Sequence, residues 1–243
     1  MNILERAKNA ILDVLFPVVC FGCGKEGKYI CEQCEGFVGE AAFICPVCQQ
    51  SSFTGEHHER CRTRYGLDGL VGIWEYEGFV KKLISQIKYQ SVTHAIGEIV
   101  ARAFGVMAQN TQIANTFLSF LLSEDTYITY VPMAKSKEKK RGFNQAVYFA
   151  KEIGKITKKE VLPLLQKIKD THSQTELDKE QRLKNVKDSF RFKSETNSKF
   201  QIPKNVVLVD DVWTTGATLK ECCRVLKKAG VQKVWGFSIA RTP

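Results

Sequence analysis

Apolar positions along the chain predict strands that alternate with helices. Residues 206–209 are four apolar residues, three of them β-branched, without polar alternation, which is typical of a buried parallel strand. The other predicted strands are residues 70–76, 127–131 and 234–240, with a short one at 161–165. Helical spacing predicts helices at residues 79–89, 95–107 and 217–229, and one that ends near residue 155. The sequence therefore predicts a parallel α/β core.

Three segments lack a clear period. Residues 116–122 are apolar and do not distinguish a helix from a strand. Residues 134–146 predict a basic loop that leads into the helix ending near residue 155. Residues 171–188 are polar and charged, and no regular element is predicted for them.

The N-terminal residues predict an amphipathic helix that ends at Pro17. Asp13 interrupts its apolar part, so it lacks the continuous apolar region of a signal peptide. We expect this helix to pack on the protein, and a helix lying on a membrane surface is the alternative. No apolar run approaches the roughly 20 residues that a membrane span needs, so we predict no membrane span.

The run from residue 206 to residue 219 predicts a ligand site. Asp210 and Asp211 follow the apolar strand, and ligands of open α/β sheets bind beyond the carboxyl ends of the strands. Residues 214–218 then offer hydroxyls, backbone N–H groups and a glycine at the start of a helix, which suits a phosphate. Two carboxylates suit sugar hydroxyls or Mg²⁺. Either half alone could be a plain turn or helix cap, but the joined pattern favours a site.

The length of the chain indicates how many domains it can form, and its net charge indicates the kind of partner. The 243 residues suffice for one ordinary domain and a small one. A formal net charge of +10 favours an anionic partner, either nucleic acid or a phosphorylated metabolite.

Seven of the nine cysteines lie between residues 20 and 61, and their spacing predicts metal binding. Two Cys-x-x-Cys pairs complete a tetrahedral zinc site, formed by Cys20, Cys23, Cys31 and Cys34. A disulfide framework would require an export signal, and none is apparent, so we expect reduced thiols in the cytoplasm.

A second metal site is less complete. Cys45, Cys48 and Cys61 supply three ligands, and position 64, where a fourth cysteine would complete the pair, is Arg64. Either His57 or His58 supplies the fourth ligand, or this site holds no metal. A crossed arrangement, in which the first Cys-x-x-Cys pair combines with the third, also stays open.

The run from residue 206 resembles the 5-phosphoribosyl-1-pyrophosphate (PRPP) motif of type I phosphoribosyltransferases. The resemblance implies that Asp210 and Asp211 meet the ribose hydroxyls. It implies a 5′-phosphate cradle formed by Thr214, Thr215, Gly216, Ala217 and Thr218. Trp213 lies where that family varies, and we expect it on the outer wall of the pocket.

Further motifs resemble the ComF family of competence-associated, phosphoribosyltransferase-like proteins. They are the cysteine-rich start, Tyr76 with Gly78, Lys88 with Tyr89, Val131 with Pro132, Arg141 to Ala146, and Thr171, Gln174, Arg182, Asn185 and Val186. The resemblance implies a type I phosphoribosyltransferase fold over residues 67–243, behind a zinc module over residues 1–66. Arg64 is the departure, because longer members carry an eighth cysteine there.

The resemblance also assigns roles to two loops. The chain after Pro132 corresponds to a pyrophosphate-binding loop, with Met133, Ala134 and Lys135 as candidates and Arg141 as a charge clamp. A solvated basic loop is the alternative. Residues 171–188 correspond to a loop that closes over PRPP, with a linker as the alternative.

Two functions follow, and the sequence does not decide between them. In the first, Asp210 and Asp211 are catalytic and hold the ribose while pyrophosphate leaves PRPP, with Mg²⁺ neutralising the leaving group; no residue identifies the acceptor. In the second, the chain is a non-catalytic module that binds single-stranded DNA and senses PRPP. Both link it to DNA uptake in natural transformation, with DNA-uptake proteins as partners.

Overall fold

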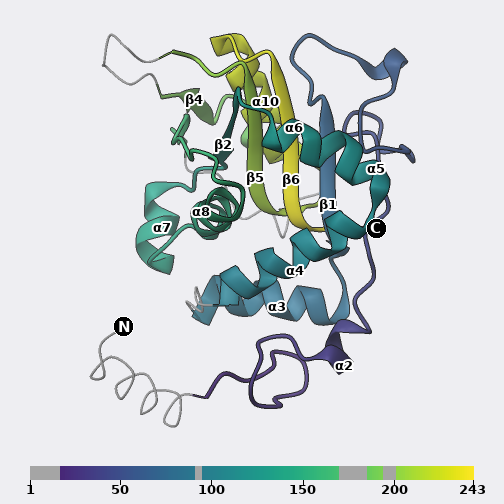
Figure 1. Cartoon of the computed structure of the whole chain (residues 1–243). Coiled ribbons are helices and arrows are strands. Elements are labelled where there is room, and N and C mark those ends of the chain that lie inside the picture. Colours follow the sequence, from purple (N-terminus) through teal and green to yellow (C-terminus); the bar gives the residue numbers. More distant parts are fainter. Residues whose placement is uncertain (1–16, 91–94, 170–184, 194–200) are drawn as a thin grey trace.

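The core of the protein is one four-stranded parallel sheet. The computed structural model describes residues 17–90, 95–169, 185–193 and 201–243, so the predicted N-terminal helix lies outside the described part. The strands lie in the order β1-β6-β5-β2, all parallel (Figure 1). Their bounds are β1 Gly69–Glu75, β2 Thr126–Tyr130, β5 Asn205–Trp213 and β6 Lys233–Arg241.

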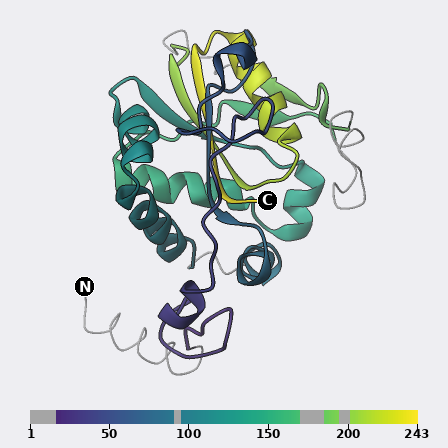
Figure 2. The same cartoon turned by 90° about the vertical axis from the view of Figure 1, so that its right-hand side faces the viewer.

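Helices cover both faces of this sheet. On one face, Val207 and Val209 of β5 join an apolar cluster with α3 (Gly78–Gln90), α4 (Ala95–Gln109) and α8 (Gln145–Thr157). On the other face, Val206 and Leu208 join a cluster with α10 (Ala217–Ala229). Side chains of a strand point alternately to the two faces, so a strand buried on both sides reads as a continuous apolar run. Figure 2 shows the sheet edge-on between these layers.

The expected α/β fold is confirmed, one undecided segment is assigned, and two local predictions change. Residues 116–122, left undecided by the sequence, are helical: they lie in the π-helix η2 (Ala114–Leu118) and α6 (Ser119–Leu122), which follow α5 (Thr111–Ile113). The short strand predicted at residues 161–165 lies later, as β3 (Leu165–Lys167), and pairs antiparallel with β4 (Phe190–Phe192) outside the main sheet. Val161 makes only an isolated bridge to Ile128.

The predicted basic loop is largely a helix. Residues Lys135–Arg141 form α7, which buries none of its residues. Lysine, arginine and glutamate are good helix formers, but an unburied helix carries no apolar period by which it could be found. Gly142, with a φ of 87°, adopts the left-handed conformation that ends the helix.

The cysteine-rich segments attach to the open edge of β1. The backbone N–H of Ala41 donates to the carbonyl of Ile73, and Leu70 donates to Gly55. The first segment includes α2 (Glu32–Glu35) and the second includes η1 (Glu59–Cys61). In Figure 1 the first lies below α3 and α4, whereas the blue segment around residue 60 lies at the upper right.

Among the helices of the described residues, none is both long enough and apolar enough to cross a membrane.

Candidate functional site

A cavity of about 510 Å³ opens where β5 meets the start of α10. The walls come from the end of β5, the loop to α10, helix α3 and the C-terminus. The lining residues are Tyr76, Glu77, Lys81, Lys88, Asp210, Asp211, Val212, Trp213, Thr214, Gly216, Ala217, Thr218, Leu219, Thr242 and Pro243. The structure thus brings both predicted carboxylates and most of the predicted phosphate loop to one cavity.

The two carboxylates lie inside β5 rather than after it, which corrects the sequence prediction. Strand β5 continues to Trp213, because its parallel pairing with β6 continues from Asp210 opposite Ser238 to Trp213 opposite Arg241. Polar residues at the end of a strand interrupt its apolar run, so a search for apolar runs ends the strand too early. Neighbouring residues of a strand point to opposite faces, so the two acids have different surroundings.

Asp211 is buried and held by two partners. Its Oδ2 lies 2.8 Å from Lys88 Nζ of α3 and accepts a 2.6 Å hydrogen bond from Gln145 Nε2 of α8. Burial acts to raise the pKa of Asp211, but the Lys88 cation and the Gln145 donor outweigh it and lower that pKa. Burial likewise opposes the charge on Lys88, and Asp211 outweighs it, so the pKa of Lys88 is raised. The site therefore fixes an ionised carboxylate beside a cation.

Asp210 has the opposite electrostatics. Burial, followed by the neighbouring Asp211 charge, raises the pKa of Asp210 to about 8. Its Oδ1 accepts a hydrogen bond from the backbone N–H of Asp211 at 2.9 Å. The charge of Lys167 on β3 acts on Asp210 more weakly in the favourable direction. Near neutral pH this carboxyl can thus gain or lose a proton when a ligand or cation arrives.

The loop between β5 and α10 is shaped by Gly216. Its φ of 72° is left-handed, and a Cβ there would lie 2.2 Å from the ring of Trp213, so only glycine fits. Trp213 is 1% exposed and lies beneath the loop, which corrects its expected place on the outer wall. Gly216, the N-cap of α10, has no side chain to cap the helix, and Thr215 Oγ1 accepts only a long 3.4 Å hydrogen bond from the Ala217 N–H. The backbone N–H groups at the start of α10 are therefore the donors that a phosphate would use.

The residues predicted to bind pyrophosphate lie outside the cavity that most of the loop of residues 214–218 lines. Ala134 is buried, Met133 is partly buried and Lys135 is exposed at the start of α7. Arg141 donates to Gln145 Oε1 at 3.1 Å, and Gln145 donates to Asp211. None of these four candidates is among the described residues that line the cavity.

Two contributors to the site were not among the sequence-predicted site residues, Lys88 and Gln145. Both stood inside the family-like motifs, and that was the only signal for them. Their role depends on packing, because α3 and α8 bring them to Asp211 from 123 and 66 positions away in the chain (211 − 88 and 211 − 145). Asn144 has a supporting place: its Nδ2 donates to Val131 O at the end of β2.

The first cysteine cluster has the geometry of a metal centre. The four predicted thiols, Cys20, Cys23, Cys31 and Cys34, all lie within 4.8 Å of one another. Cys23 Sγ and Cys31 Sγ are 3.6 Å apart, close to the roughly 3.8 Å between sulfurs of a tetrahedral zinc site. Burial acts to raise the pKa of Cys20, but backbone donors outweigh it and lower the pKa to about 6, which favours a thiolate ligand. The donor set fits zinc.

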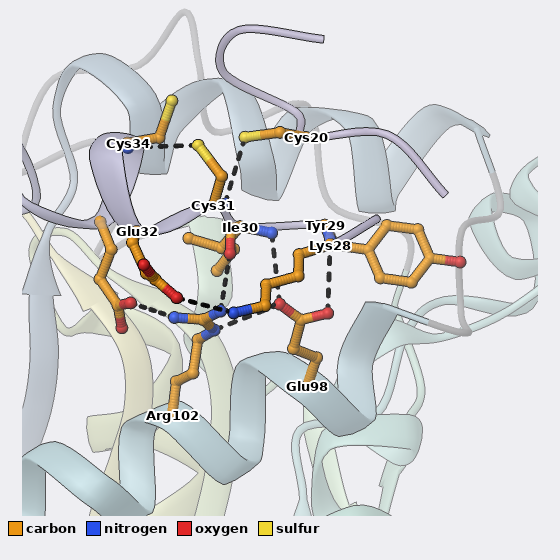
Figure 3. A network of polar contacts seen from close by, with 10 residues as sticks. Cys20, Lys28, Tyr29, Ile30, Cys31, Glu32, Cys34, Glu98 and Arg102 are labelled. Carbon is orange, nitrogen blue, oxygen red and sulfur yellow. Dashed lines mark hydrogen bonds and ion pairs between the residues drawn. The ribbon is translucent and has the colours of Figure 1, made fainter. Parts of the chain in front are cut away.

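This cluster is attached to α4 by a partly buried network of charged groups (Figure 3). The carboxylate of Glu98 accepts from the backbone N–H groups of Tyr29 and Ile30, each at 3.3 Å. Arg102 donates to the Ile30 carbonyl at 2.6 Å and pairs with Glu98 and Glu35. These contacts hold the bend at Tyr29 and Ile30, just before Cys31, against the helix.

The second cluster is completed by His58. The ligand atoms of Cys45, Cys48, Cys61 and His58 lie within 4.8 Å of one another. His58 Nδ1 is 3.4 Å from Cys48 Sγ and 4.0 Å from Cys61 Sγ, while its Nε2 lies 3.0 Å from the Ser51 carbonyl. A second ring nitrogen bonded to a carbonyl is the usual way to orient a histidine ligand.

The structure excludes two of the alternative ligand sets for the clusters. His57 is not in the second cluster, because its Nδ1 lies 2.9 Å from the Asp68 carbonyl. The crossed arrangement does not occur either: each cluster is built from neighbouring segments of the chain. Two cysteine-rich groups can therefore hold metal ions, and both sets suit zinc.

Comparison with known proteins agrees with this geometry. Residues 140–238 match the family model of the phosphoribosyl transferase domain. Competence protein F of Haemophilus influenzae is 27% identical over 98% of this chain and 93% of its own length. Competence protein ComFC of Bacillus subtilis is 24% identical, over 92% of this chain and 84% of its own, and ComFC of Streptococcus pneumoniae is 25% identical over 87% of each.

The parallel sheet, the loop at the start of α10 and the domain match define a phosphoribosyltransferase-like protein. The similarity to the competence proteins extends over most of the chain and includes the cysteine-rich start. Together with the domain match, this similarity supports a ComF family, phosphoribosyltransferase-like protein.

Proposed function

We propose that this protein binds PRPP with Mg²⁺ in the cavity at the end of β5. The observation that carries the proposal is the cavity itself, which joins a loop suited to phosphate with two carboxylates and two lysines. In this proposal the loop of residues 214–218 holds the 5′-phosphate, and Asp210 and Asp211 hold the ribose hydroxyls.

The same arrangement supports phosphoribosyl transfer with pyrophosphate release. Lys88 keeps Asp211 ionised, so a carboxylate is available to orient the ribose without a proton transfer. Lys81 and Lys88 place cations on the wall of the cavity, where a pyrophosphate group is attracted. Mg²⁺, when bound with PRPP, would neutralise charge on the leaving pyrophosphate.

Pyrophosphate release from PRPP tests turnover. Enzyme-coupled detection of pyrophosphate, with ammonia and simple amines as acceptors, should show release by the wild type that the combined Asp210→Asn and Asp211→Asn variant loses. Stabilisation by PRPP without any release would leave binding in place and reject transfer to these acceptors.

Because the relatives are competence proteins, we also propose a role in DNA uptake during natural transformation. The cysteine-rich residues up to about residue 66 then form a zinc module that carries two ions beside the phosphoribosyltransferase-like domain. The donor sets of the two clusters support this number.

A second candidate function is binding of single-stranded DNA. Phe37, next to the first cysteine cluster, is 82% exposed, and bases stack on such aromatic rings in proteins that bind single strands. The net charge of +10 favours the phosphate backbone. Of the other aromatic residues near this cluster, Phe21 is buried and stacks on Tyr29.

Fluorescence anisotropy with a labelled single-stranded oligonucleotide tests the second function. Phe37→Ala should weaken binding, whereas Phe53→Ala, which removes an equally exposed ring beside the other cluster, should not. An affinity for the oligonucleotide that is unchanged in Phe37→Ala and is not weakened by added salt would count against this second function.

A further inference from the structure

The second metal cluster touches the loop that we assign to phosphate. Gln49 directly follows the ligand Cys48, and its backbone N–H donates to the Cys45 carbonyl at 2.9 Å, which closes the metal-binding turn. Gln49 has a φ of 64°, an uncommon conformation for a residue other than glycine. Its side-chain Nε2 donates to the carbonyl of Thr215 at 3.0 Å.

A second contact joins the same turn to α10. Lys220 Nζ, one turn into the helix, donates to the carbonyl of Val47 at 3.3 Å. A cavity of about 540 Å³ lies between this turn and α10, with Val47, Ala217 and Lys220 in its walls. The turn and the helix are therefore joined at this point by polar contacts beside a hollow, and not by continuous apolar packing.

The orientation of the Thr215 carbonyl determines where the next backbone N–H in the loop points. In a trans peptide, the carbonyl of one residue and the N–H of the next point in opposite directions. The hydrogen bond from Gln49 to Thr215 O thus fixes the direction of the Gly216 N–H, and Gly216 lines the candidate phosphate cavity. Because glycine permits either orientation of this peptide, the hydrogen bond from Gln49 favours one of them.

We propose that Gln49 is a positioning residue that couples metal binding in the second cluster to phosphate binding by the loop. The inference rests on the proposed function, because it requires the loop to bind a phosphate group. A metal ion orders the turn from Cys45 to Cys48, the turn places Gln49, and Gln49 orients the Thr215–Gly216 peptide. Coupling between two binding sites is reciprocal, so the phosphate ligand also holds the metal more tightly.

The test compares Gln49→Asn with Gln50→Asn in the metal-loaded full-length chain. Asparagine tolerates the left-handed conformation but is one methylene too short to reach Thr215. Gln50 is exposed and serves as the matched control. Isothermal titration with Mg²⁺–PRPP should give a Kd at least about fivefold weaker for Gln49→Asn, within the usual range of coupling. Wild-type affinity in Gln49→Asn would overturn the proposal.

The reciprocal arm measures zinc transfer to a chromogenic chelator. PRPP should slow release from one of the two clusters in the wild type and in Gln50→Asn, and the slowing should disappear in Gln49→Asn. Zinc release that is the same with and without bound PRPP in the wild type would overturn the coupling.

A further variant separates loss of metal from loss of the contact to Thr215, and a second ligand separates this coupling from the proposed function. If Gln49→Asn loses metal, Gln49→Glu keeps the length of the side chain but replaces the Nε2 donor with an oxygen that cannot donate to Thr215 O. It should weaken binding with metal retained, and unchanged affinity in this variant overturns the proposal. Inorganic pyrophosphate serves as a second probe. If pyrophosphate binds with the same dependence on Gln49 while PRPP does not, the coupling stands and the proposed function fails. If neither probe binds the wild type, both fail.

Discussion

Two adjacent aspartates on one strand have opposite electrostatic states. Asp211 faces Lys88 and Gln145 and has a lowered pKa. Asp210 accepts a backbone N–H from Asp211, and burial, followed by the Asp211 charge, raises its pKa to about 8. The difference follows from the alternation of side chains along β5, which exposes the two carboxyls to different layers of the molecule. The surroundings of each aspartate therefore lead to a separate expectation for the stability of the protein.

Removing the cation beside Asp211 should destabilise the fold. Lys88→Met leaves a largely buried carboxylate without its charge partner, which typically costs about 3 kcal/mol. Urea unfolding should show this loss. Lys81→Met, an exposed lysine of the same cavity, should change the free energy of unfolding by less than about 0.5 kcal/mol. Equal stability of the two variants would contradict the assigned role of Lys88.

Asp210 should make the protein less stable as the pH rises. Its pKa in the folded protein, about 8, lies above that of an ordinary aspartate, so the folded state keeps a proton that the unfolded state has lost. Stability from this group is present at low pH and is lost as the pH approaches 8. Asp210→Asn removes the ionisation, so its Tm should exceed that of the wild type, by more at pH 8.5 than at pH 6. Thermal unfolding at both pH values checks this, and a constant difference would reject it.

At the scale of elements, helix α4 and the edge of β1 carry the cysteine-rich segments. The first cluster depends on Glu98 and Arg102 of α4, and the second on backbone pairing with β1 and on His58. Spacing in the sequence favoured the ligand set of the first cluster and left only the crossed arrangement open. It left the second open, because His57 and His58 are neighbours and only the fold decides which ring faces the cysteines.

The two histidines should differ in metal content. His58→Ala removes a ligand of the second cluster, so the purified protein should carry about one zinc ion fewer per chain than the wild type. His57→Ala is the matched control and should keep both ions. Elemental analysis by mass spectrometry measures the ratio of metal to protein. Loss of zinc in both variants, or in neither, would contradict the assignment.

Arg102 should govern how firmly the first cluster is attached. Arg102→Ala removes the donor to the Ile30 carbonyl and leaves Glu98 without its cation, while all four thiols stay in place. Amide hydrogen exchange of Tyr29 and Ile30 should therefore become faster with the zinc content unchanged. Exchange at the wild-type rate would show that this network does not fasten the cluster.

At the scale of the whole molecule, the sequence predicted the architecture well and the connections between distant parts poorly. Apolar runs and helical periods predicted the sheet and α10, because burial imposes those patterns. The exposed helix α7 and the extension of β5 through the aspartates carry no such pattern. Contacts such as Lys88 with Asp211 and Gln49 with Thr215 depend on packing between residues far apart in the chain, which no local pattern encodes.

Isothermal titration calorimetry with Mg²⁺–PRPP is the most direct test of whether this cavity binds PRPP. We expect one site per chain in the wild type, and loss of binding when Asp210→Asn and Asp211→Asn are combined. Binding should be unchanged when the exposed neighbours Glu124→Gln and Asp125→Asn are combined, which removes the same charge elsewhere. No binding by the wild type, or equal binding by all three proteins, would contradict the assignment of this cavity to PRPP.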